Sequence, residues 1–155
     1  MLHPYLQQKE LVDFCRQAGI ATMAYSPLGS ADSYSGRSFP AKGTGPFETP
    51  SGGTTLLQNE IILRIAAARG MSPAQVLIRW SIQQGHTVLP KSVNPERIAQ
   101  NLQPASDASQ MALSDDEMAM LASLDCGFRY GIGYGPGHYD CPNAPWFQAS
   151  CGSKL

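Results

Sequence analysis

Residues 86–101, HTVLPKSVNPERIAQN, contain the pattern that decides the fold class. The first five of them predict a short buried strand. Asn94 and Pro95 then predict the start of a helix, with Asn as the N-cap and Pro at the first helical position. We expect this helix to continue to about Leu102. A strand followed by polar residues and a capped helix is one step of an α/β layout.

A second unit of this kind lies earlier in the chain. Residues 7–18 predict an amphipathic helix that Gly19 ends. The residues that fall on its apolar face are Leu11, Phe14, Cys15 and Ala18. Residues 20–25, IATMAY, predict a short strand that is buried on both faces, as in a parallel sheet. Polar and Gly-Pro residues follow it, as they follow the strand at residues 86–90.

Further helices are predicted between and after the two strands. Residues 55–69 have an apolar repeat, and Ser72-Pro73 predicts the start of a helix that ends near Gln84 and is apolar nearly all round. Ser114 and Glu117 predict a capping box at the start of another helix. Residues 26–54 and the chain from Gly127 onward are rich in Gly and Pro and predict irregular structure.

The composition argues against two classes of partner. The chain has 155 residues, with 11 Lys plus Arg against 12 Asp plus Glu, and its net charge is −1. A nucleic-acid binder usually has a basic excess, and no apolar run approaches the ~20 residues of a membrane helix. We therefore expect no nucleic-acid partner and no membrane partner. The length suits one folded domain but is below the ~250 residues of a complete (β/α)8 barrel.

The cysteines do not predict a disulfide framework. The four are Cys15, Cys126, Cys141 and Cys151. Their irregular spacing favours reduced thiols in an intracellular protein. A zinc site at His138, Cys141 and Cys151 is the alternative, but no paired metal-ligand spacing supports it.

The polar residues after the second strand predict an anion site. Lys91 offers a positive charge, Ser92 a hydroxyl, and Arg97 a planar fork that suits phosphate. The start of the following helix, with free N–H groups and its dipole, also favours an anion. The alternative is a solvated helix start whose Glu96 forms a surface ion pair.

One face of the same helix adds groups for a heteroaromatic ring. Arg97, Gln100 and Asn101 lie at i, i+3 and i+4, so a guanidinium that could bind a phosphate and two side-chain amides share one face of the helix. Ile98 and Leu102 are expected to anchor the other side. A phosphate beside a purine describes the adenosine 2′-phosphate end of NADP.

Several motifs resemble the aldo-keto reductase family in order and spacing. They are residues 3–6 (HPYL), 25–30 (YSPLGS), 73–80 (PAQVLIRW) and 90–101 (PKSVNPERIAQN). The resemblance covers roughly residues 1–147 and implies an α/β fold, the carboxyl-terminal portion of a (β/α)8 TIM barrel that is incomplete. Residues 20–25 and 87–90 would be the seventh and eighth strands. Residues 148–155 would be a flexible tail outside this partial domain.

The resemblance also implies roles in binding NADPH or NADP⁺. Tyr25 resembles the aromatic residue that stacks on the nicotinamide ring. The loop that holds the pyrophosphate would contain Ser26, Leu28 and Ser30, and Asp32 would clasp the cofactor by pairing with Lys91. The 2′-phosphate clamp would consist of Lys91, Ser92, Val93 and Arg97, with Asn101 beside adenine. Gln100 stands where the family usually has Glu, and its amide still accepts and donates there.

The family's catalytic Asp, Tyr, Lys and His would all lie upstream of His3. We therefore expect no catalytic residue in this sequence, and two readings stay open. One is the cofactor-binding half of an NADPH-dependent oxidoreductase for aldehydes and ketones. The other is a truncated, non-catalytic relative that binds only NADP(H) or a protein partner. An unrelated anion-binding α/β module is a third, weaker reading.

The last three residues, Ser153, Lys154 and Leu155, match the tripeptide that the peroxisomal import receptor reads. They predict a peroxisomal location, with the cytoplasm as the alternative. Two readings stay open for five aromatic residues of the loop and tail. They either line a substrate mouth or pack as ordinary loop residues, namely Tyr34, Phe39, Tyr130, Tyr139 and Trp146.

Overall fold

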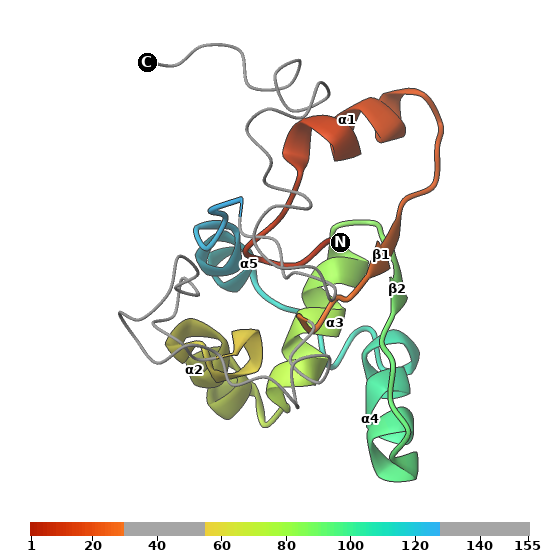
Figure 1. Ribbon diagram of the computed structural model, residues 1–155. Coiled ribbons are helices and arrows are strands. Elements are labelled where there is room, and N and C mark those ends of the chain that lie inside the picture. Colours follow the sequence, from red (N-terminus) through yellow and green to blue (C-terminus); the bar gives the residue numbers. More distant parts are fainter. Residues whose placement is uncertain (30–54, 128–155) are drawn as a thin grey trace, which may run out of the picture.

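The computed structural model describes residues 1–29 and 55–127, and Figure 1 shows how their elements are arranged. The elements are α1 (Lys9–Gln17), β1 (Met23–Tyr25), the 3-10 turn η2 (Leu56–Gln58), α2 (Glu60–Arg69), α3 (Pro73–Gln83), β2 (Thr87–Leu89), α4 (Pro95–Ser106) and α5 (Asp115–Ala122). The predicted α/β class is confirmed. Helices that alternate with parallel strands are consistent with part of a (β/α)8 barrel.

The two strands lie side by side and run parallel, in the register Met23 to Thr87, Ala24 to Val88 and Tyr25 to Leu89. Their burial on both faces was predicted wrongly. Ala24 is fully buried, but Met23 and Tyr25 are 60% and 44% exposed. Within the described residues each strand has one neighbour, and α3 packs against β2. One face of this small sheet is therefore covered and the other is open.

Helix α3 lies at the centre of the core. Its Val76, Leu77 and Trp80 are buried, and it packs against α2, α4 and β2. This confirms the prediction that a helix apolar nearly all round is covered on both sides. The rest of the core comes from the N-terminal segment, η2, α2, α5 and the segment before α5, as Met1, Tyr5, Leu6, Leu56, Ile62, Ile65, Ala66, Leu113 and Leu121.

The N-terminal segment is buried, which no periodicity in the sequence predicted. The hydroxyl of Tyr5 accepts a hydrogen bond from Asn59 Nδ2 at 2.9 Å. Nε2 of Gln7 donates to the carbonyl oxygens of Leu121 at 3.3 Å and Ala122 at 2.9 Å. Side chains of this segment therefore join it to the start of α2 and the end of α5.

Local capping signals set most helix starts. Ser72, Asn94 and Ser114 all accept N-cap hydrogen bonds, as predicted. The single helix predicted at residues 55–69 is wrong in one respect. Asn59 has an extended backbone, and its side chain accepts from the N–H groups of Ile61 and Ile62. The segment is therefore divided into η2 and α2.

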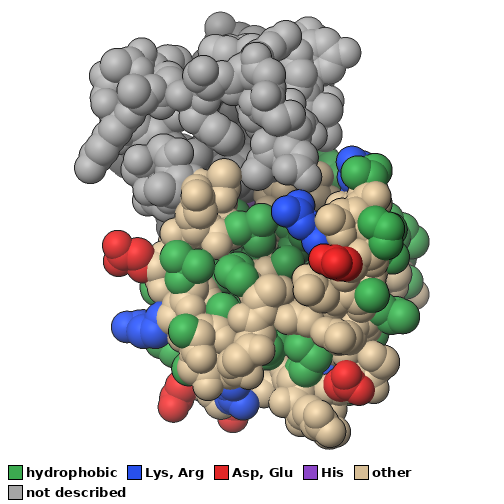
Figure 2. Space-filling model, turned by 90° about the horizontal axis from the view of Figure 1, so that it is seen from below, with side chains coloured by type: hydrophobic (Ala, Val, Ile, Leu, Met, Phe, Trp, Pro, Cys, Tyr) green, Lys and Arg blue, Asp and Glu red, His purple; other side chains and the backbone are tan. Residues whose placement is uncertain are grey.

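Two helices leave their apolar side chains at the surface, against expectation. Leu11 and Phe14 of α1 are 54% and 63% exposed, and Figure 1 shows α1 away from α2 and α3. Ile98 and Leu102 of α4 are 53% and 66% exposed, so they do not anchor that helix. Hydrophobic side chains also reach the surface on the face seen from below, among charges of both signs (Figure 2).

In the part of the chain that the structure describes, no single helix is long and apolar enough to cross a membrane. Together α2 and α3 reach that length and composition, but they bend by 93° at the break between them. Most of α3 is buried in the core.

Candidate binding pocket

A pocket of about 370 Å³ lies where the loops after both strands meet the starts of α3 and α4. Its volume is in the lower part of the ~300–1,000 Å³ range of small-molecule sites. The lining residues are Ser26, Pro27, Leu28, Gly29, Leu57, Ser72, Pro73, Ala74, Leu89, Lys91, Ser92, Arg97, Gln100 and Asn101. The pocket lies off the carboxyl ends of both parallel strands, where ligands bind in such sheets.

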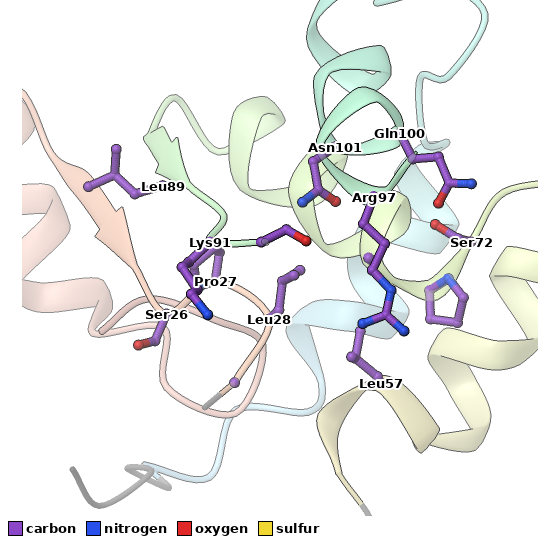
Figure 3. A pocket seen from close by; sticks show the side chains of 14 residues that line it. Ser26, Pro27, Leu28, Leu57, Ser72, Leu89, Lys91, Arg97, Gln100 and Asn101 are labelled. Carbon is purple, nitrogen blue, oxygen red and sulfur yellow. The ribbon is translucent and has the colours of Figure 1, made fainter. Parts of the chain in front are cut away.

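The charged lining of the pocket, as far as the described residues form it, is positive. Lys91 and Arg97 contribute to it, and none of the described lining residues is acidic. Figure 3 shows Arg97 extending from α4 into the pocket in the direction of Leu57. Among the described residues, Lys91, Glu96 and Arg97 form no ion pair. The alternative of an ion-paired helix start at Glu96 is thus not seen in this part of the chain.

The start of α4 offers fewer backbone donors than the sequence predicted. Pro95 has no N–H, and Asn94 Oδ1 accepts from the N–H of Arg97 at 3.1 Å. Ser92 Oγ accepts from the N–H of Asn94 at 3.2 Å. These bonds stabilise the helix start but occupy groups that could face an anion. The cationic side chains of Lys91 and Arg97 are therefore the main groups among the described lining residues that could attract an anion.

The predicted helical face is confirmed by the pocket. Arg97, Gln100 and Asn101 all line it from α4, with Gln100 and Asn101 about one turn after Arg97. Figure 3 shows Gln100 and Ser72 at the same end of the pocket, on α4 and at the start of α3. The side-chain amides of Gln100 and Asn101 thus follow the guanidinium of Arg97 along α4. This arrangement suits a phosphate joined to a hydrogen-bonding ring.

The loop after β1 enters the pocket through a tight turn. The N–H of Gly29 donates to the carbonyl of Ser26 at 3.1 Å, and Ser26 has a φ of 51°. Left-handed backbone at a residue other than glycine costs about 1–3 kcal/mol and is common at ligand sites. The turn places Pro27 and Leu28 on the pocket wall.

Some predicted site residues lie elsewhere. Tyr25 does not line the pocket and is 44% exposed, and Val93 is 83% exposed at the surface. Ser30 and Asp32 lie outside the described residues, so the pairing of Asp32 with Lys91 stays a prediction. The same holds for the aromatic residues proposed at a substrate mouth, the residues of the alternative zinc site and the tail at residues 148–155.

The structure adds lining residues that the sequence did not predict. They are Pro27, Gly29, Leu57, Ser72, Pro73, Ala74 and Leu89. The sequence predicts Ser72-Pro73 only as a helix start, because its approach to α4 depends on packing between residues far apart in the chain. Apolar Leu57 and Pro73 give the pocket a surface on which a flat ring can lie.

Several known proteins are similar to this chain in sequence or in fold. The family model described as Aldo/keto reductase family matches residues 1–125. The chain belongs to this family. The aldo/keto reductase slr0942 of Synechocystis sp. is 46% identical over 132 residues, 85% of this chain and 36% of the relative. Morphine 6-dehydrogenase of Pseudomonas putida is 43% identical over 136 residues, 84% of this chain and 39% of the relative.

Two further proteins are similar to the chain. The NAD(P)H-dependent D-xylose reductase I,II of Candida tropicalis is 41% identical over 128 residues, 83% of this chain and 36% of the relative. The crystal structure of apo Gox0644 matches with a TM-score of 0.62 and 34% identity, over 84% of this chain and 39% of that one. The chain thus spans between 36% and 39% of the length of these four relatives.

Proposed function

We propose that the chain binds NADP(H) in this pocket and supplies the cofactor-binding part of an aldehyde or ketone oxidoreductase. The observation that carries the proposal is that Lys91 and Arg97 both line the pocket, with Gln100 and Asn101 on the same face of α4 as Arg97. Family membership and a relative described as NAD(P)H-dependent support the same class of cofactor.

The residues present fit the adenosine end of NADP(H). Arg97 offers a fork to the 2′-phosphate, and Lys91 a mobile charge, and none of the described lining residues is a carboxylate. Gln100 and Asn101 present amides that both donate and accept, as an adenine edge requires. Ser26 and Leu28 would face the pyrophosphate, and Tyr25 the nicotinamide ring.

When bound, NADPH would supply hydride to a carbonyl carbon, and the chain's own residues would bind and orient the cofactor. The proposal gives this sequence no proton donor, because the family resemblance assigns none of its residues to the catalytic Asp, Tyr, Lys or His. A carbonyl substrate is therefore proposed for the intact enzyme. The alternative is a non-catalytic relative that binds only NADP(H) or a protein partner.

Two measurements on the 155-residue chain test the proposal. Fluorescence titration should show saturable binding of NADPH, and binding of neither NADPH nor NADH would refute it. An assay of NADPH oxidation with an aromatic aldehyde should show no turnover. Sustained oxidation by pure protein would show that the chain contains a proton donor after all.

We also propose a peroxisomal location, carried by Ser153, Lys154 and Leu155 as an import signal at the C-terminus. These residues lie outside the described part of the chain, so the proposal depends on the sequence alone. It places the reductase in an organelle and is independent of the cofactor argument. The partner it implies is the peroxisomal import receptor.

A further inference from the structure

A proline inside α4 leaves one backbone carbonyl without its helical donor. Pro104 lies within the helix and is buried. Since proline has no N–H, it cannot donate to the carbonyl of the residue four positions earlier. That residue is Gln100, which lines the pocket. The defect in the helix is therefore located at the pocket wall.

Gln75 of α3 supplies the missing donor. Its Nε2 donates to the carbonyl oxygen of Gln100 at 3.3 Å and to Oε1 of Gln103 at 2.6 Å. Its Oε1 accepts from the N–H of Ser72 at 2.8 Å. We call these three hydrogen bonds the Gln75 bridge. The residue is 7% exposed, so a loss of these bonds would leave buried polar groups unpaired.

The Gln75 bridge joins two walls of the pocket. Ser72 lies at the start of α3 and Gln100 on α4, and both are lining residues. One buried amide thus hydrogen-bonds to groups at the start of α3 and on α4. Because Arg97 and Asn101 are on the same face of α4 as Gln100, the bridge also sets their position.

Among the described elements, α4 packs mainly against α3. Its Ile98 and Leu102 are mostly exposed, and Pro104 is its buried residue. The other polar link to α3 is at the far end of the helix, where Arg79 Nη1 donates to the carbonyl of Pro104 at 3.1 Å. The hydrophobic core does not include α4. Changes at Gln75 should therefore move α4 before they unfold the chain.

We infer that Gln75 is a positioning residue for the adenosine end of the pocket, acting through the Gln100 carbonyl that Pro104 leaves free. The inference rests on the proposed function, because it assigns the pocket to that ligand. Gln75 does not itself line the pocket. Its effect on binding passes through the placement of α4.

A matched pair of variants tests this inference in the full chain. Gln75→Met keeps the side-chain length and removes the bridge. Gln83→Met is the control, because Gln83 is on the same helix and also makes three hydrogen bonds, with Arg79 and Leu113, away from the pocket lining. The probe is adenosine 2′,5′-bisphosphate, titrated by calorimetry. We expect Gln75→Met to weaken its binding roughly tenfold and Gln83→Met less than about twofold.

Pro104→Ala provides a rescue that a general loss of stability would not produce. The substituted residue regains a backbone N–H, which can donate to Gln100 within the helix. In that background the loss caused by Gln75→Met should fall to roughly threefold or less. An equal loss in both backgrounds would show that Gln75 does not act through the Gln100 carbonyl, and would overturn the inference.

Hydrogen exchange of the α4 amides separates this inference from the proposed function. Gln75→Met should raise exchange in α4 and leave α5 unchanged. Unchanged binding and unchanged α4 exchange would overturn the inference, as would equal losses of binding in the Gln75 and Gln83 variants. If the unsubstituted chain does not bind the bisphosphate, the proposed function is wrong, and so is the role of Gln75 in ligand binding.

Discussion

The hydroxyl of Thr22 and Nδ1 of His86 lie 2.7 Å apart, within hydrogen-bonding distance. These residues immediately precede β1 and β2, and the next backbone bond runs from the N–H of Thr87 to the carbonyl of Thr22 at 3.0 Å. A side-chain pair therefore closes the end of the small sheet. His86 is 8% exposed. Burial lowers the pKa of His86, and the positive charge of Arg16 lowers it further.

The free energy of unfolding should fall as pH is lowered and His86 takes up a proton. In the unfolded chain a histidine titrates near pKa ~6.5, above the lowered pKa of folded His86. The unfolded state thus binds more protons between these two values. The contribution is complete above ~6.5 and is lost as pH falls toward the folded pKa, by at most ~1.4 kcal/mol per pH unit.

Urea unfolding at about pH 8 and about pH 5.5, either side of the ordinary histidine pKa, measures this effect. His86→Gln cannot titrate, and its free energy of unfolding should depend less on pH than that of the unsubstituted chain. The same pH dependence in both proteins would assign the effect to other groups.

Arg97→Ala should weaken NADPH far more than NADH. The guanidinium is expected to contact the 2′-phosphate that only NADPH carries, and such a charge-assisted bond contributes about 1.5–3 kcal/mol. That corresponds to a loss of roughly ten- to a hundredfold in affinity. Fluorescence titration with both cofactors measures it. The NADPH affinity of Arg97→Lys, which keeps the charge and loses the fork, should lie between that of Arg97→Ala and that of the unsubstituted chain. Equal losses for NADPH and NADH would contradict the assignment.

Glu117→Ala should destabilise the junction of α2 and α5. Glu117 accepts two hydrogen bonds from Arg69, at 2.8 and 2.6 Å, and one from the N–H of Ser114 at 2.7 Å. The bonds from Arg69, then that from Ser114, lower the pKa of Glu117. Loss of the capping box should cost about 1 kcal/mol in free energy of unfolding.

Glu60→Ala is the control for that variant. Glu60 is also in the first turn of a helix, and within the described residues it forms no ion pair. Its substitution should change the free energy of unfolding by less than ~0.5 kcal/mol, measured by urea denaturation near neutral pH. Similar losses in both variants would show that the hydrogen bonds of Glu117 contribute no stability beyond that of any acidic residue in the first turn of a helix.

A reporter fused to the last ten residues should become punctate and coincide with a peroxisomal marker in cells. Removal of Leu155 should return it to the cytosol, because the import receptor reads a free C-terminal tripeptide. Fluorescence microscopy of the two fusions measures this. A diffuse signal from the intact tail would refute the location and leave the cofactor proposal unaffected.

Much of the local structure could be predicted because its causes lie within a few residues. Ser72-Pro73, Asn94-Pro95 and the Ser114–Glu117 box each satisfy backbone groups three or fewer positions away. The face shared by Arg97, Gln100 and Asn101 follows from the helical repeat alone. These local signals are sufficient to predict the helix starts and much of the charged lining of the pocket.

Burial and the remaining pocket residues could not be read in this way, because they depend on what a segment packs against. Apolar Phe14, Met23 and Leu102 follow patterns typical of covered faces, yet among the described elements they are exposed. The sequence predicts that the helix after Asn94 ends at about Leu102, but α4 continues through Pro104 to Ser106. Gln75, on the preceding helix, donates to the Gln100 carbonyl that Pro104 leaves free. Short-range capping and periodicity were thus set by the sequence alone. Which faces are covered, and how α3 and α4 close the pocket, was decided only by contacts between distant segments.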